Sequence, residues 1–169
     1  MSPHSFGYSL LEVLVALMVL SAGVIGAAAL QLSAWQLTHQ SYLHTTAQQL
    51  ASEMIEWLQL VDEAALDEFE NMSLSGSYPQ SAHCYGRHCD ADALLQFIQA
   101  DWRQRAQTKL PEAQVRICRD TVPWDSDALA YRWECRPSDN ALLVIKMGWL
   151  DKQGMNKPDA PLVVMSASR

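Results

Sequence analysis

Basic residues are missing from the first half of the chain, because all 12 Lys and Arg residues lie at or after Arg87. The 169 residues carry a formal net charge of -7. An acidic chain of this kind is not typical of proteins whose main partner is nucleic acid. The same gap removes the Lys and Arg residues that ordinarily orient a membrane segment. The composition therefore argues against nucleic acid as the main partner. It also means that Lys and Arg residues do not indicate how a membrane segment near the N-terminus would be oriented.

Helix-breaking residues are also scarce. No Pro occurs between Pro3 and Pro79, and no Gly occurs between Gly26 and Gly76. Apolar residues recur at roughly helical spacing among Gln, Ser, Thr and His as far as Val61. We therefore predict one long helix over residues 8–61. About 50 residues at 1.5 Å each give a length of about 75 Å.

The first half of this predicted helix is almost entirely apolar. From Leu10 to Leu30, Glu12 is the only charged residue. A run of this length can cross a bilayer, and a carboxylate within it costs about 2.5–3.5 kcal/mol near the centre and less near an end. We interpret residues 8–30 as a transmembrane segment. Residues 31–61 are then an amphipathic half that packs on a globular head formed by residues 62–169.

The segment Gly7-Tyr8-Ser9-Leu10-Leu11-Glu12-Val13 resembles the N-terminus of the type IV prepilin family, which includes the pseudopilins of type II secretion. The resemblance implies that a prepilin peptidase removes residues 1–7 by cutting between Gly7 and Tyr8, and that it then N-methylates Tyr8. It further implies that residues 8–30 enter a filament core, with Glu12 as the assembly carboxylate. A buried charge becomes less costly when it meets an ammonium group of a neighbouring subunit.

The alternative to a prepilin is an ordinary signal anchor. Prepilin leaders usually carry Lys or Arg, whereas residues 1–7 offer only His4 and the initiator amine. Either these two groups suffice to orient the helix, or translation starts upstream.

Between the long helix and the C-terminal region, the pattern indicates a loop and a short helix. The acidic run of residues 62–70 is interpreted as a solvated helix end or loop, with a cation site as the alternative. Residues 72–89 are rich in Ser, Gly, Pro and His, and are predicted to be loop. A second helix is expected from Asp90, capped by Asp90 or Asp92, and Pro111 forces its end by Leu110.

Short β-prone segments follow. We predict strands at Gln114–Arg119, Tyr131–Arg136 and Leu162–Met165, and another in which Leu143, Ile145, Met147 and Trp149 share a face. A turn is expected at Asp151–Gly154. Four sequential strands with short links favour an antiparallel meander. The predicted fold class is α+β and type IV pilin-like: a long N-terminal α-helix packed on a C-terminal antiparallel β-sheet head.

The four cysteines follow an export signal, so they should meet an oxidising compartment. Of the three possible pairings we favour Cys84 with Cys89 and Cys118 with Cys135. The run from His83 to Cys89 offers zinc ligands as an alternative, but its spacing is not a standard zinc pattern. We therefore expect no metal and no cofactor.

One feature of the cysteine pattern conflicts with the predicted strands. Val115 and Ile117 share a face of their strand, which puts Cys118 on the opposite face. A bulge or a different cystine pairing would resolve the conflict.

The C-terminal half indicates which members of the prepilin family the chain resembles most. Cys89-Asp90-Ala91-Asp92-Ala93-Leu94-Leu95, a Trp-bearing helix, Leu110-Pro111 and Val115-Arg116-Ile117-Cys118-Arg119-Asp120 resemble the PilV-type minor pilins, termed type IV pilus modification proteins. The resemblance implies a minor pilin that joins other minor pilins to prime pilus assembly. Its partners would be the prepilin peptidase, other minor pilins, the assembly machinery and the inner membrane. It would cross that membrane once with a periplasmic head, and sit at the pilus tip after assembly.

Two alternatives concern other functions. The closest is a minor pseudopilin of type II secretion. The other is a ligand- or DNA-binding head, since basic residues alternate with aromatic ones in the C-terminal half. The residues of this hypothetical patch are Arg103, Arg105, Lys109, Arg116, Arg119, Arg132 and Arg136, with Trp102 and Trp124. Because the arginines alternate with core positions, we interpret them as a solvated face and consider nucleic acid an unlikely partner.

Catalytic motifs do not emerge from the sequence. The five histidines lie outside recognisable nucleophile or zinc-protease motifs, and no Ser sits in a Gly-x-Ser-x-Gly frame. We therefore expect that the protein is not an enzyme but a substrate of the prepilin peptidase.

Overall fold

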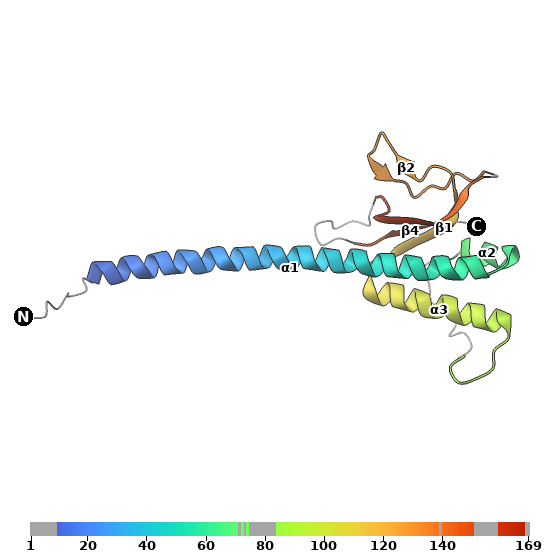
Figure 1. The fold of residues 1–169 in the computed structure, drawn as a ribbon, viewed down its shortest axis with the longest axis horizontal. Helices are drawn as coiled ribbons and strands as arrows, with labels where there is room; N and C mark the ends of the chain where they lie inside the picture. Colours follow the sequence, from blue (N-terminus) through green and yellow to red (C-terminus); the bar gives the residue numbers. More distant parts are fainter. Residues whose placement is uncertain are drawn as a thin grey trace, which may run out of the picture. The chain divides into compact units, whose positions relative to one another are not determined.

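The computed structural model describes residues 10–70, 72, 74, 84–138, 140–150 and 159–167. The chain is α+β, with a long N-terminal helix and a small antiparallel sheet (Figure 1). Its helices are α1 (Leu10–Leu60), α2 (Glu63–Glu70) and α3 (Ala91–Lys109). Its strands are β1 (Gln114–Asp120), β2 (Trp124–Asp125), β3 (Ala130–Tyr131), β4 (Leu142–Gly148) and β5 (Val163–Ala167). Two compact units divide it, Met1–Ser41 and Tyr42–Arg169, and we call the second unit the head.

The helix α1 is continuous over 51 residues, as the lack of helix breakers predicts. The predicted start at Tyr8 lies outside the described residues. Within the head, the buried residues of α1 run from Leu43 to Leu58. The sheet sets the length of this buried stretch, because a seven-residue strand such as β4 spans about 24 Å. That length matches the rise of about 16 helical residues.

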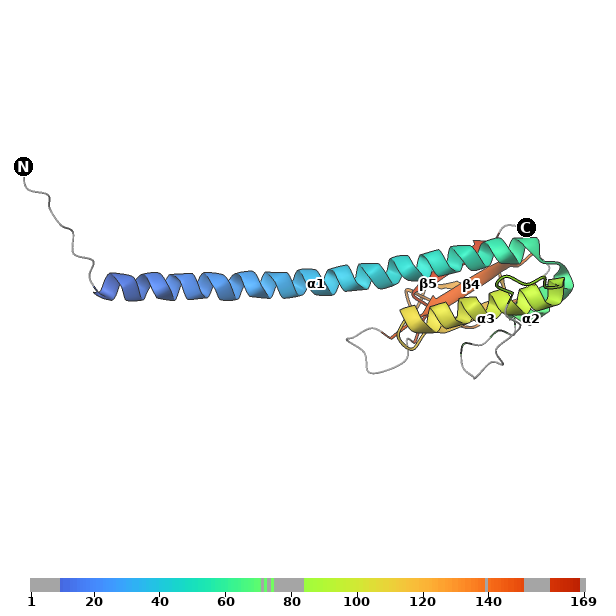
Figure 2. The same cartoon turned by 90° about the horizontal axis from the view of Figure 1, so that it is seen from below.

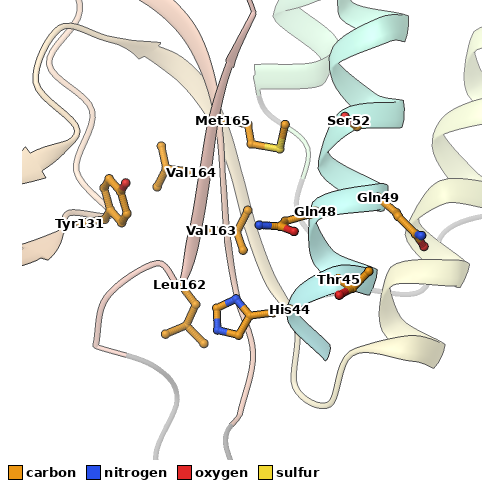
Figure 3. Close-up of a pocket in the computed structure, with 10 residues that line it drawn as sticks. All are labelled: His44, Thr45, Gln48, Gln49, Ser52, Tyr131, Leu162, Val163, Val164 and Met165. Carbon is orange, nitrogen blue, oxygen red and sulfur yellow. The ribbon is translucent and has the colours of Figure 1, made fainter. Parts of the chain in front are cut away.

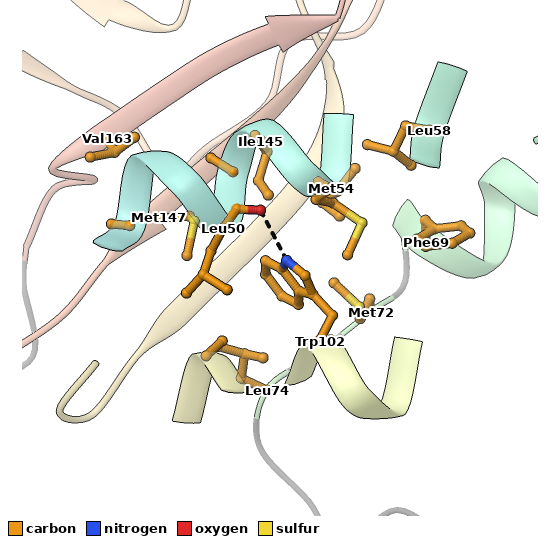
Figure 4. Packing of buried hydrophobic residues seen from close by; sticks show 14 of the residues in the cluster. Leu50, Met54, Leu58, Phe69, Met72, Leu74, Trp102, Ile145, Met147 and Val163 are labelled. Carbon is orange, nitrogen blue, oxygen red and sulfur yellow. Dashed lines mark hydrogen bonds between the residues drawn. The ribbon is translucent and has the colours of Figure 1, made fainter. Parts of the chain in front are cut away.

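The core of the head lies between the helices and one face of the sheet (Figure 4). A single stripe of α1 faces the sheet, because its buried residues recur every three or four positions. Leu50, Met54 and Leu58 belong to this stripe, and the fully buried Trp102 of α3 lies beside them. The indole Nε1 of Trp102 donates a 2.9 Å hydrogen bond to the carbonyl oxygen of Leu50, which ties α3 to α1.

The sheet has three strands in the order β1-β4-β5, all antiparallel. A separate two-stranded ribbon, β2-β3, is inserted in the chain between β1 and β4. The predicted four-stranded meander is therefore wrong in topology. The last strand is also shifted, since it runs over Val163–Ala167 and not over Leu162–Met165. The predicted turn at Asp151–Gly154 lies outside the described residues.

Residues 132–136 do not form the predicted strand, because β3 ends at Tyr131. Figure 1 shows the ribbon on the side of the sheet opposite α1. The segment that follows β3 covers this outer face, where the backbone carbonyls of Arg132 and Glu134 accept hydrogen bonds from the side chain of Lys146 in β4. The alternating pattern of residues 132–136 thus reflects contacts with a sheet face and not pairing with a neighbouring strand.

This covering segment also resolves the position of Cys118. The structure pairs Cys118 with Cys135, and Cα atoms of the pair are 6.3 Å apart. Neighbouring Ile117 is buried on the inner face, so Cys118 faces outward, where Cys135 lies in the covering segment. Neither a bulge nor a different pairing is needed, and the favoured pairing is confirmed.

The two shorter helices differ in how well the sequence predicts them. The N-cap of α3 is Asp90, whose side chain accepts a 2.8 Å hydrogen bond from the backbone N–H of Ala93, and the helix ends at Leu110 before Pro111, as predicted. The acidic run of residues 62–70 contains a separate helix, α2, whose Leu66 and Phe69 are buried in the core. Of the two predicted states, a solvated helix end or a loop, the structure has a helix, and Asp62, Glu63 and Asp67 are exposed. The burial of Leu66 and Phe69 in the core was not predicted, because the acidic side chains obscure an amphipathic pattern. Figure 2 shows α1 and α3 running alongside each other in the head.

Candidate functional site

The first part of α1 is a candidate membrane span. An 18-residue window of this helix reaches a mean hydropathy of 2.5, and none of that window is buried. Its large apolar residues are exposed by about half or more, from Val13 at 48% to Leu10 at 83%. By length and composition the helix can cross a bilayer.

Before Glu53, Glu12 is the only Asp, Glu, Lys or Arg residue of α1, and it lies in the first turn of the helix. A carboxylate at this position interacts favourably with the positive end of the helix dipole. The predicted cleavage residues, Gly7 and Tyr8, lie outside the described residues, so the processing step stays a prediction. Glu12 is thus a single negative charge at the start of an apolar helix.

Two hydroxyl groups of α1 bond to the helix itself. Ser21 Oγ, in the apolar part, donates to the carbonyl of Met18 at 2.9 Å, and Thr38 Oγ1, beyond it, donates to the carbonyl of Ala34 at 2.8 Å. Polar groups satisfied in this way tolerate a lipid environment, where no water can replace a missing hydrogen bond. The two glycines of the segment, Gly23 and Gly26, would have nothing within 4 Å of an added Cβ. Their small size therefore has no explanation in the contacts of the single chain.

The short loop closed by Cys84 and Cys89 is a candidate docking element of the head. The structure joins these two cysteines in a disulfide with Cα atoms 5.9 Å apart, which confirms the favoured pairing. Gly86 allows the tight turn, since its φ of 72° is rarely adopted by other residues. Tyr85 rests edge-on against Phe97 of α3, with ring centroids 4.9 Å apart, yet remains 74% exposed. The loop is thus an exposed aromatic feature fixed to α3.

The same loop was the alternative zinc site. With both sulfur atoms in a disulfide, Cys84 and Cys89 offer no thiolate to a metal ion. His83 lies outside the described residues. Among the residues that the structure describes, no group of three or more His, Cys, Asp or Glu side chains gathers in a way that could hold a metal.

A buried ion pair holds the ribbon against the sheet. Lys146 Nζ lies 2.6 Å from Asp120 Oδ2, and both side chains are fully inaccessible to solvent. The same ammonium donates to the carbonyls of Arg132 and Glu134, each at 2.7 Å, so all three of its protons are used. Asp120 Oδ1 accepts from the backbone N–H groups of Val122 and Arg136, at 3.0 and 3.3 Å. We call this group the Lys146 clamp.

Burial disfavours the charged form of Asp120 and acts to raise its pKa. The hydrogen bond from Lys146 and those from the backbone N–H groups of Val122 and Arg136 act in the opposite direction and outweigh it, so the pKa lies below the usual value. Asp120 is therefore a carboxylate at neutral pH. Sequence reasoning missed the clamp, although a Lys inside the apolar run Leu142–Met147 was a signal that both faces of this strand are covered.

Three basic residues of the hypothetical DNA-binding patch are paired with carboxylates. Arg105 makes a bidentate pair with Glu53 of α1 and a second pair with Asp101 at 2.8 Å. Arg119 pairs with Glu63, and Arg132 with an aspartate of the ribbon. The aromatic partner Trp102 is fully buried, so no nucleotide base can stack on it.

A groove runs along β5 (Figure 3). Its volume is about 630 Å³, and its walls come from α1 on one side and from Tyr131 of β3 on the other. In the described part of the chain, β5 pairs only with β4, so its second edge is open to an extended segment. The lining residues on α1 are His44, Thr45, Gln48, Gln49 and Ser52, and those next to β5 are Leu162, Val163, Val164 and Met165.

Comparison with known proteins finds no matching family model, no matching curated protein and no matching solved structure. The function is therefore argued from the residues and the geometry alone. Three features carry that argument: the apolar helix with its single carboxylate, the exposed cystine loop, and the open edge of β5.

Proposed function

We propose that this protein is a minor pilin of the type IV pilus, which joins other minor pilins to prime pilus assembly. The observation that carries the proposal is the position of Glu12. It is the only charge in the apolar part of a 51-residue helix, five residues after a glycine that is followed by an aromatic residue. The resemblance of this N-terminus to prepilins supplies the family.

The first step is insertion and processing. The apolar part of α1 enters the inner membrane with the leader in the cytoplasm and the head in the periplasm. The prepilin peptidase then cuts between Gly7 and Tyr8 and methylates the new amine. The protein is the substrate of that reaction, and we propose no catalytic activity of its own.

The second step is recognition between helices. A carboxylate within lipid is destabilised by about 2.5–3.5 kcal/mol near the centre of the bilayer. An ammonium group on a neighbouring subunit relieves this penalty, so Glu12 aligns the heights of adjacent helices. Gly23 and Gly26 support close approach, since small residues let helices pack tightly in lipid and nothing in the single chain requires them.

The third step is docking of the head on other minor pilins. Two features support it: the open edge of β5, which offers backbone hydrogen-bonding groups, and the exposed Tyr85 in the cystine loop. The Lys146 clamp and the two disulfides hold these features in place, which limits the conformational entropy lost on docking.

The test is the N-terminal sequence and intact mass of the protein from membranes that contain an active prepilin peptidase. We expect a chain that begins with N-methylated Tyr8. Membranes with an inactive peptidase serve as the control, and replacing Gly7 with a bulky residue should block cleavage. If the chain keeps residues 1–7 while the same peptidase processes another substrate, the protein is not a prepilin but an ordinary membrane-anchored domain.

The remaining candidate within the family is a minor pseudopilin of type II secretion, whose N-terminus has the same form. Deletion of the gene distinguishes the two. Loss of surface pili with normal secretion supports the pilus, and loss of secretion with normal pili supports the secretion system.

A further inference from the structure

Trp35 is an aromatic residue of α1 that the core does not use. Its side chain is 80% exposed, although the periodicity of the sequence places it among residues expected to pack on the head. Burial along α1 starts eight residues later, at Leu43. The indole of Trp35 is therefore accessible to a partner outside the single chain.

The length of the apolar run places Trp35 relative to a bilayer. The run from Leu10 to Leu30 spans about 31 Å at 1.5 Å per residue, which matches a hydrocarbon core of about 30 Å. The first polar residue after it is Gln31. Trp35 follows Leu30 by five residues, or about 7.5 Å, which is the depth of the headgroup layer beyond the core.

The charge pattern strengthens this placement. Membrane helices are usually held in depth by Lys, Arg, Trp or Tyr at their ends. This chain has no Lys or Arg before Arg87, so basic residues cannot supply the anchor near the span. An indole has an apolar body and one N–H donor, which suits the boundary between acyl chains and headgroups.

We propose that Trp35 is an interfacial anchor that binds the headgroup layer of the phospholipid bilayer on the side of the head. With Trp35 at one boundary, Glu12 lies 23 residues away, about 35 Å along the helix, and so at the opposite boundary of the hydrocarbon core. The anchor thus sets the depth at which Glu12 meets its partner. This inference rests on the proposed membrane insertion of α1.

The experiment uses the full-length chain in phosphatidylcholine vesicles that contain lipids brominated either near the headgroup or near the chain ends. Flotation of the vesicles first shows whether the chain is inserted. Tryptophan fluorescence then reports the depth, because bromine quenches only nearby indoles. Subtracting the signal of the variant Trp35→Phe isolates the contribution of Trp35 from those of the five tryptophans in the head.

We expect the Trp35 contribution to be quenched at least about twofold more by the shallow bromines than by the deep ones, as an interfacial indole requires. The matched control Trp124→Phe, at a half-exposed position of the ribbon, should leave lipid quenching unchanged. If the chain floats but shallow bromines do not quench Trp35, or deep bromines quench it more, the anchor is refuted and the membrane span stands. Failure to float refutes the span itself, and the anchor with it.

Discussion

Replacing Lys146 with Met should strongly destabilise the head. The substitution keeps the side-chain volume but removes the ammonium that lies 2.6 Å from Asp120 in a fully buried pair. It leaves the carboxylate of Asp120 without its counter-charge, and the carbonyls of Arg132 and Glu134 lose a donor. Breaking a buried pair from one side costs about 3–5 kcal/mol. Since domains of this size are stable by about 5–15 kcal/mol, the loss is a large part of the total.

The assay is urea unfolding of the oxidised full-length chain in detergent micelles, followed by tryptophan fluorescence. With a urea m value of about 1–3 kcal/mol/M, the midpoint should fall by roughly 2 M. The variant Lys109→Met serves as the control, because Lys109 is exposed at the end of α3 and its loss should change stability by only about 0.5 kcal/mol.

A double variant separates the buried charge from general packing. Asp120→Asn keeps the Oδ1 atom that accepts from Val122 and Arg136, and removes the negative charge. Combined with Lys146→Met, it leaves no unpaired ion in the core, so the double variant should be more stable than Lys146→Met alone. If Lys146→Met costs less than about 1 kcal/mol, or if the double variant is the least stable of the set, the reasoning about the clamp is refuted.

Other features of the structure give further predictions. Because the pKa of Asp120 is lowered in the folded chain, its ionisation stabilises the fold fully above the usual carboxylate pKa of about 3.9, and this stabilisation is lost as the pH falls through the lowered value. The free energy of unfolding, measured over this acid range, should fall accordingly. In the variant Asp120→Asn this pH-dependent loss should be absent. Trp102→Phe should destabilise the head by about 1–2 kcal/mol, because it removes a buried hydrogen bond to α1 and some packed volume, and thermal unfolding measures the change. Arg105→Lys should cost about 0.2–1 kcal/mol, since the pair with Glu53 is one-third exposed; a loss above about 2 kcal/mol in urea would contradict this estimate. Glu12→Ala should leave N-terminal processing intact but impair incorporation into pili, with Glu12→Asp as the matched control; normal piliation of the Ala variant would refute the pairing step.

Local features were readily predicted. Helix α1 follows from a long stretch without Pro or Gly, and α3 begins at the capping side chain of Asp90 and ends before Pro111. Strands β1 and β4 follow from short β-prone runs. The two disulfides were among three possible pairings, and the favoured one was found. Each of these depends on interactions within a few residues, or on a small set of alternatives.

The errors have a common origin in contacts between distant residues. The sequence predicts a solvated helix end or loop at residues 62–70 and misses the packing of α2, because Leu66 and Phe69 are buried only in the assembled core. Residues 132–136 were taken for a strand because their alternation marks contact with a sheet face as well as it marks a ladder. Which residues of α1 are buried within the head, from Leu43 to Leu58, likewise depends on the sheet, which lies far along the chain.

The sequence by itself determined that this chain has a long apolar helix with one carboxylate near its start, and an α+β head that carries four cysteines. These properties depend on composition and on short-range periodicity. Only the tertiary structure decided that Lys146 and Asp120 form a buried pair that holds the ribbon, and that Trp35 lies outside the core. Both depend on which segments pack together, including segments more than 20 residues apart in the sequence. Burial matters because the free energy of a charged pair or an indole depends on whether water surrounds it.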